Sequence, residues 1–61
     1  MTITFDNPGG KSTGFVLTDD DGKKYSGTCT PDSDDFEWFD TPPSDKQDDF
    51  EKAIIDEWKN P

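Results

Sequence analysis

Polar and apolar residues alternate along three runs in the N-terminal half of the chain. The runs span residues 2–6, 13–18 and 23–30, and they are rich in β-branched and aromatic residues. Alternation with a period of two is typical of strands that bury one face. Turn-forming residues from Asn7 to Gly10, and Pro31 further on, interrupt the pattern. We therefore predict three short strands, and their short connections favour an antiparallel arrangement.

The loop between the second and third runs decides which side chains share a face. A two-residue turn at 21–22 puts Tyr25 on the face opposite Phe15 and Leu17. A three-residue loop at 20–22 instead gathers the side chains of Phe15, Leu17, Tyr25 and Cys29 on one face. The longer loop also lets Gly22 adopt the left-handed conformation of a type I turn with a bulge. We predict the three-residue loop, with Gly27 lying under an aromatic ring.

Residues 36–39 are a candidate fourth strand. This run reads Phe-Glu-Trp-Phe, so its pattern is imperfect. Successive side chains of a strand point to opposite faces, and Trp38 and Phe39 therefore cannot both be buried. We expect one of the two rings to be at least partly exposed.

The C-terminal segment, residues 44–59, has the spacing of a helix. Phe50, Ile54 and Trp58 recur at intervals of four and form one apolar stripe. The prolines at 42–43 prevent an earlier start. We predict one helix over this segment, with Asn60 and Pro61 after it.

Two polar pairs are expected to support this helix. Ser44 and Gln47 have the spacing of a capping box, in which each side chain bonds a backbone N–H at the helix start. Asp48 and Lys52 are four residues apart in the order that favours an ion pair.

These elements predict an α+β fold in a single domain, residues 1–61. A small antiparallel sheet of three to four strands packs against one C-terminal helix. The helix is expected to bury its apolar stripe on the sheet residues Ile3, Phe5, Phe15, Leu17 and Tyr25.

Composition is unusual for a folded chain of this size. Aliphatic and aromatic residues make up 26% of 61 residues, and the formal net charge is −9. Such values are typical of disordered chains, but eight aromatic side chains can form a small core. The single cysteine permits no internal disulfide. No signal peptide or membrane-spanning run is recognisable, so we expect a cytoplasmic protein.

The sequence lacks the residues that most enzymes use. It has no histidine and no arginine, and so no Cys–His or Ser–His pair. The acids at 19–21 and Gly22 do not fit a calcium loop, because the first and twelfth positions are then Leu17 and Thr28. We expect neither an enzyme nor a metal or cofactor site.

The acids are concentrated in one segment. Nine acids and one lysine lie between Asp32 and Glu51, giving that segment a charge of −8. Single surface acids are usually only solvated, but clustered acids repel one another and cost stability. We expect this segment to bind a partner through Asp32, Asp34, Asp35, Glu37, Trp38, Phe39, Asp40, Asp45, Asp48 and Asp49.

The favoured partner is a protein with a basic surface, because nucleic acids and anionic membranes repel this chain. A row of carboxylates can imitate nucleic-acid phosphates and occupy the channel of a nucleic-acid-binding protein. In size, composition and lack of catalytic groups, the chain is similar to phage-encoded DNA mimics that inhibit host proteins. The sequence thus favours an inhibitor that is a monomer or a simple homodimer.

Two other functions remain open from the sequence. The acids around Trp38 and Phe39 are suited to docking, with one ring as the anchor in a groove that is both basic and apolar. Alternatively, residues 2–5 or the third strand could form a free sheet edge that joins a partner's sheet in an assembly. Solubility alone is an equally open explanation of the acidic cluster.

Overall fold

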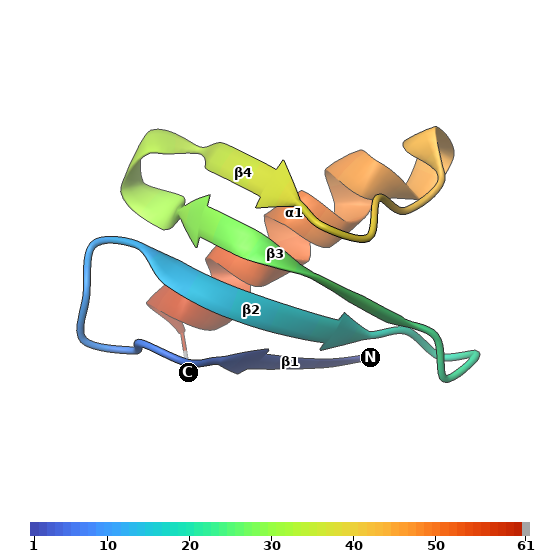
Figure 1. Cartoon of the computed structure of the whole chain (residues 1–61), viewed down its shortest axis with the longest axis horizontal. Coiled ribbons are helices and arrows are strands. Elements are labelled where there is room, and N and C mark those ends of the chain that lie inside the picture. Colours follow the sequence, from blue (N-terminus) through green and yellow to red (C-terminus); the bar gives the residue numbers. More distant parts are fainter. Residues whose placement is uncertain (61) are drawn as a thin grey trace.

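The computed structural model describes residues 1–60 and forms a four-stranded antiparallel sheet with one helix on one face (Figure 1). Pro61 lies outside the described residues. The strand order is β1-β2-β3-β4, so every strand pairs with its neighbour in sequence. The elements are β1 (Thr2–Phe5), β2 (Thr13–Thr18), β3 (Lys24–Thr30), the short 3-10 helix η1 (Pro31–Ser33), β4 (Asp35–Trp38) and α1 (Ser44–Lys59).

This architecture confirms the predicted α+β class and the candidate fourth strand. The fourth strand begins and ends one residue earlier than predicted, and β1 and β3 are each one residue shorter. The proposal that the third strand could be a free edge is wrong, because β3 lies between β2 and β4. The free edges are β1 and β4, since each pairs on one side only.

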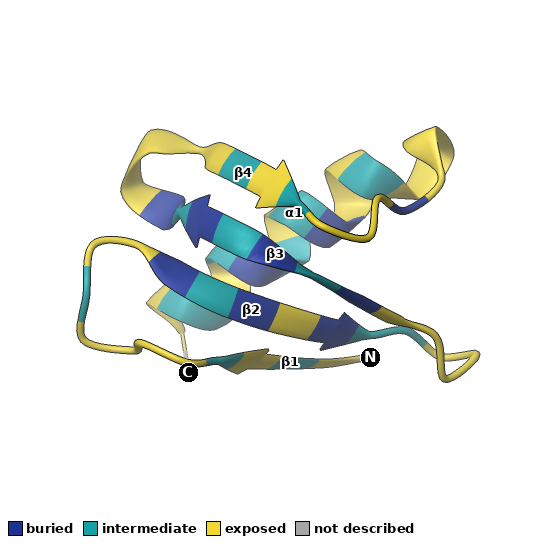
Figure 2. Ribbon diagram, in the orientation of Figure 1, coloured by how far each residue is buried: buried dark blue, intermediate teal, exposed yellow. Residues whose placement is uncertain are grey.

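The core lies between the sheet and α1. Residues of β2 and β3 alternate between buried and less buried positions along each strand (Figure 2). From the helix, Phe50 and Ile54 are buried against this face. The rings of Phe5 and Trp58 pack in a T-shaped arrangement with their centroids 5.1 Å apart. The apolar stripe of α1 therefore faces the sheet, as predicted. The buried hydrophobic residues are Phe15, Leu17, Tyr25, Cys29, Phe50 and Ile54.

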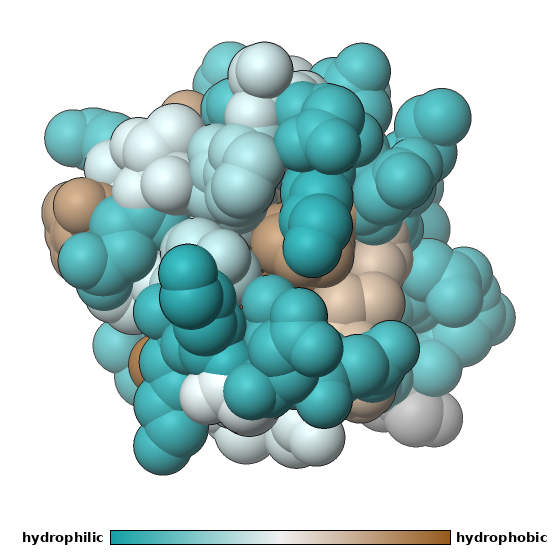
Figure 3. Space-filling model, turned by 90° about the vertical axis from the view of Figure 1, so that its right-hand side faces the viewer, coloured by the Kyte–Doolittle hydropathy of each residue, from teal (hydrophilic) through white to brown (hydrophobic). Residues whose placement is uncertain are grey.

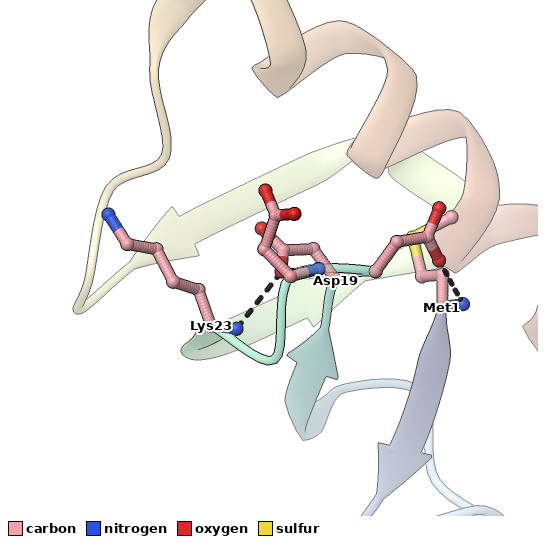
Figure 4. A network of polar contacts seen from close by, with 5 residues as sticks. Met1, Asp19 and Lys23 are labelled. Carbon is pink, nitrogen blue, oxygen red and sulfur yellow. Dashed lines mark hydrogen bonds and ion pairs between the residues drawn. The ribbon is translucent and has the colours of Figure 1, made fainter.

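The β2–β3 hairpin has the predicted three-residue loop. Leu17 pairs with Tyr25. The Asp19 N–H donates to the Lys23 carbonyl at 2.9 Å, which closes the loop. The Asp19 carboxylate accepts the Lys23 N–H at 3.0 Å (Figure 4). Gly22 has φ +84°, the left-handed conformation that glycine adopts without steric cost. The pairing of β2 with β3 and the conformation of Gly22 therefore both match the predicted three-residue loop.

The predicted capping box does not form. Pro43 is the N-cap residue, with φ −54° and ψ 142°, and Ser44 is already the first helical residue. The Pro43 carbonyl accepts the N–H groups of Lys46 and Gln47 at 2.9 and 3.0 Å. Because Ser44 is itself helical, its side chain does not occupy the N-cap position that the capping box requires. The Gln47 side chain instead donates to Glu51 at 3.4 Å.

The predicted ion pair between Asp48 and Lys52 is also absent. Within residues 1–60 the structure contains one ion pair, and it joins the N-terminal ammonium to Asp20. Both Asp48 and Lys52 are exposed. At such exposed positions, the entropy lost by holding both side chains in one geometry offsets most of the attraction between their charges.

Candidate functional site

The fold divides the acidic segment among several sides of the molecule. Along β4, Asp35 and Glu37 alternate with Phe36 and Trp38, which pack against the core. The two acids therefore point away from the helix, on the outer face of the sheet. Asp32 and Asp45 are exposed, the first in η1 and the second in the first turn of α1. The predicted acids do not form one continuous band.

A second group of acids lies where β4 meets the helix. Asp34 has φ +54°, which turns the chain sharply from η1 into β4. It shares a hollow of about 210 Å³ with Asp48 and Glu51, while Lys52 supplies one positive charge. The fold thus brings Asp34 and Asp48 together from distant positions in the sequence.

Asp49 belongs to a different surface at the tip of the hairpin. A hollow of about 400 Å³ is lined by Asp19, Asp20, Asp21, Lys46, Asp49 and Phe50. Figure 3 shows this end of the molecule, where hydrophilic side chains surround a small hydrophobic area. The sequence pattern around the three hairpin acids predicts only a turn. Their run at a hairpin tip was visible in the sequence, but their proximity to the helix was not.

Within the hairpin, one acid is neutralised by the chain itself. The Met1 ammonium donates to Asp20 Oδ1 at 2.8 Å (Figure 4). This hydrogen bond and ion pair hold the pKa of the Asp20 carboxyl below its usual value of 3.8. No lysine forms an ion pair with a carboxylate in the part of the chain that the structure describes. The acids from residue 32 to residue 49 are all exposed, so their charges remain available to solvent.

The two candidate anchor rings have different environments. The ring of Trp38 meets the ring of Phe15 edge-on at 4.9 Å, and its indole N–H donates to Glu51 at 3.0 Å. Trp38 is thus held by the core, as is Phe36. Phe39 follows on the opposite side and is 66% exposed. The expectation that one of the two rings stays exposed is confirmed.

The exposed ring of Phe39 borders a hollow on the outer face of the sheet. This hollow has a volume of about 310 Å³ and crosses the sheet from β1 to the end of β4. Its floor includes Gly14, Val16 and Ser26, and Asp6 lines it on the β1 side. Val16 is 39% exposed. Apart from Phe39, these residues are not recognisable as a site from the sequence, because their proximity depends on strand pairing.

The remaining reactive group is buried. Cys29 is 3% exposed, and burial raises the pKa of its thiol above the usual value. Within residues 1–60 no three histidine, cysteine or acidic side chains are arranged to hold a metal ion. Among those residues there is likewise no helix with the length and apolar character to cross a membrane.

Comparison with known proteins identifies no relative of this chain. No protein-family model, no curated protein and no solved structure matches the chain significantly.

Proposed function

We propose that this protein binds a basic surface of another protein and thereby blocks the binding of nucleic acid there. One observation carries the proposal. The acids from residue 32 to residue 49 are all exposed, and none of them is paired with a lysine. Their mutual repulsion opposes folding, and a cationic partner relieves it.

The charge selects the class of partner. A net charge of −9 repels nucleic acids and anionic membranes, and it attracts proteins whose surfaces bind phosphates. Attraction at long range speeds association and makes it sensitive to salt. An inhibitor that competes for a phosphate-binding channel needs this property and no catalytic group.

The start of α1 is the part of the acidic surface that can be tested most cleanly. Asp45, Asp48 and Asp49 are exposed and lie within its first two turns. Substitution of all three with Asn removes three charges and keeps the shape of each side chain. We expect the triple variant to fold normally and to lose most of its affinity for the basic partner.

The purified chain is used as bait in a cell lysate at two salt concentrations, about 0.05 and 0.5 M. Binding that depends on charge weakens steeply as the salt concentration rises, so a charge-driven partner should be retained only at the lower one. Proteins retained only at low salt are then tested for displacement of DNA by the chain. A variant with Asp56→Asn and Glu57→Gln, outside the acidic segment, serves as the control. Equal binding of the triple variant and the wild type contradicts a role for the helix start. Failure of every retained protein to release DNA contradicts the proposed inhibition.

A second function, assembly through a free sheet edge, is favoured by one observation. The free edge of β1 carries no charged side chain along Thr2–Phe5, whereas the free edge of β4 carries Asp35 and Glu37. Charged residues on an edge discourage strand pairing. Analytical sedimentation distinguishes the two functions by the size of the species in solution. An inhibitor is expected to be a monomer or simple dimer, and an assembly subunit is expected to form larger species. Thr4→Lys places a charge on the β1 edge and should disrupt those larger species.

A further inference from the structure

The outer face of the sheet is the one large face that the helix leaves uncovered in the described structure. In Figure 1 the sheet lies in front of α1, so this face is turned to the viewer. Thr4 pairs with Val16, and Val16 pairs with Ser26, which forms one row across three strands. Phe39 continues this row beyond the end of β4, because its N–H donates to the Ser26 carbonyl at 2.9 Å.

Phe39 is exposed but held firmly in place. The Ser26 carbonyl also accepts the Asp40 N–H at 3.3 Å, and the Ser26 hydroxyl donates to the Asp40 carboxylate at 3.1 Å. Two hydrogen bonds therefore hold the backbone at Phe39 and Asp40, and a third ties the Asp40 side chain to Ser26. A backbone fixed before binding loses little entropy when a partner covers the ring that it carries.

A carboxylate lies in the same hollow as this ring. Asp6 Oδ1 accepts the Gly14 N–H at 2.8 Å, which fixes the carboxylate above the sheet. A Cβ atom at Gly14 would lie 2.5 Å from Asp6 Oδ2, so this oxygen occupies the space that a side chain on the outer face would fill. The glycine therefore makes room for the carboxylate and for whatever binds beside it.

We infer that this hollow binds an arginine side chain from a basic segment of the partner protein. The guanidinium group stacks on the Phe39 ring and donates to Asp6, and its aliphatic stem lies on Val16. Arginine combines a planar cation, several donors and an apolar stem, and it is enriched at protein interfaces. The inference rests on the proposed function, because it specifies where the basic partner docks.

Charge complementarity decides between occupants of this face. Asp6 lines the hollow, and the Asp40 carboxylate accepts the hydroxyl of Ser26, which also lines it. Glu37 lies on the same outer face beside Thr28, and Lys24 is the only lysine on the outward side of β2, β3 and β4. A second copy of the chain would bring like charges together, and a nucleic acid would bring phosphates against carboxylates. A cationic protein segment is the occupant that these charges attract.

The test is a titration of the ¹⁵N-labelled chain with two blocked peptides at 0.15 M salt. One peptide alternates glycine with arginine, and the other has lysine in place of each arginine, so their charges match. We expect the arginine peptide to bind about two- to fivefold more tightly, the contribution of an exposed cation–π contact. The amide signals of Gly14, Val16, Ser26, Phe39 and Asp40 should shift.

Substitutions assign the contacts. Phe39→Leu keeps an apolar side chain but removes the π system, so the preference for the arginine peptide should decrease. Asp6→Asn keeps the acceptor for the Gly14 N–H and removes the charge, so both peptides should bind more weakly. Asp56→Asn removes the same charge from α1, on the other side of the sheet and outside the acidic segment, and should leave the shifts on the outer face unchanged.

Two results overturn the inference and leave the proposed function standing. The first is equal affinity of both peptides for the wild-type chain. The second is a set of shifts centred on residues 19–22 and the start of α1, with Phe39 unaffected. Absence of binding by either peptide, together with no salt-sensitive partner in the lysate experiment, contradicts the proposed function itself.

Discussion

Individual residues in this protein are selected by close packing more than by polarity. Cys29 is buried in the core without a polar partner, where a small apolar side chain fits. Phe39 and Trp38 are adjacent and chemically similar, yet one lies in solvent and the other packs on Phe15. The alternation of β4 alone produces this difference.

The buried thiol of Cys29 predicts a loss of stability in alkali. Burial raises its pKa in the folded chain above the usual value of 9.0. The unfolded chain therefore loses the thiol proton first as the pH rises. The contribution of Cys29 to the free energy of unfolding is complete below pH 9.0, and it is lost as the pH rises through the higher pKa of the folded chain. We expect wild type to lose more stability than Cys29→Ala between pH 8 and about 10.5 in urea denaturation. Parallel curves for the two proteins contradict this explanation.

At the level of secondary structure, the contact between β3 and β4 depends on a glycine. Gly27 pairs with Trp38 across the strands. A Cβ atom at Gly27 would clash with the Glu37 carbonyl oxygen and lie 3.0 Å from Trp38 Cα and 3.1 Å from Phe15 Cζ. Two of these three atoms belong to the backbone, so they cannot move without displacing β4.

Gly27→Ala is therefore expected to destabilise the protein by about 1–3 kcal/mol, the usual cost of overpacking. In a domain of this size each kcal/mol lowers Tm by about 4–8 °C. Gly9→Ala is the matched control, since nothing lies within 4 Å of a Cβ atom there and its φ is not positive. The measurement is thermal denaturation by circular dichroism, and equal Tm values for the two variants contradict the steric explanation.

The helix depends on its tertiary contacts as well as on its own sequence. Its start is set by Pro43 and not by a serine side chain, and the ion pair expected on its exposed side does not form. Phe50 and Ile54 are buried against the sheet, and Trp58 meets Phe5. Burial of this apolar stripe is the main source of its stability, as in most short helices.

For the molecule as a whole, charge repulsion is the dominant electrostatic term. The net charge is −9, and the one ion pair within residues 1–60 uses the N-terminal ammonium. A domain of this size has little stability to spare. Dissolved salt should therefore change its stability more than in an average protein.

We expect Tm to rise as sodium chloride increases from about 0.01 to 1 M, because the screening length falls from about 30 to 3 Å. Each kcal/mol of relieved repulsion raises Tm by about 4–8 °C. The variant with Asn at positions 45, 48 and 49 should start from a higher Tm and gain less from salt. A Tm that falls or stays constant with salt shows that the acids are not under mutual repulsion.

The sequence by itself predicted the strands, the hairpin and the helix of this protein, but not the cap or the ion pairing of the helix. The alternation of side chains predicted the strands, and the hairpin register followed from keeping Leu17 and Tyr25 on one face with Gly22 in the loop. The apolar stripe identified the helix and the side that it buries. These predictions succeeded because each depends on residues that are close together in the chain, where backbone geometry has few alternatives.

Only the tertiary structure decided which distant residues became neighbours. It brought Asp49 to the acids of the hairpin tip, Asp48 to Asp34, and Phe39 to a hollow that also contains Asp6. These neighbours depend on how the helix crosses the sheet and on the pairing of all four strands together. Charged surface residues contribute little to either choice, because water solvates them equally well in many arrangements. The candidate binding surface was therefore set by the packing of the apolar core beneath it.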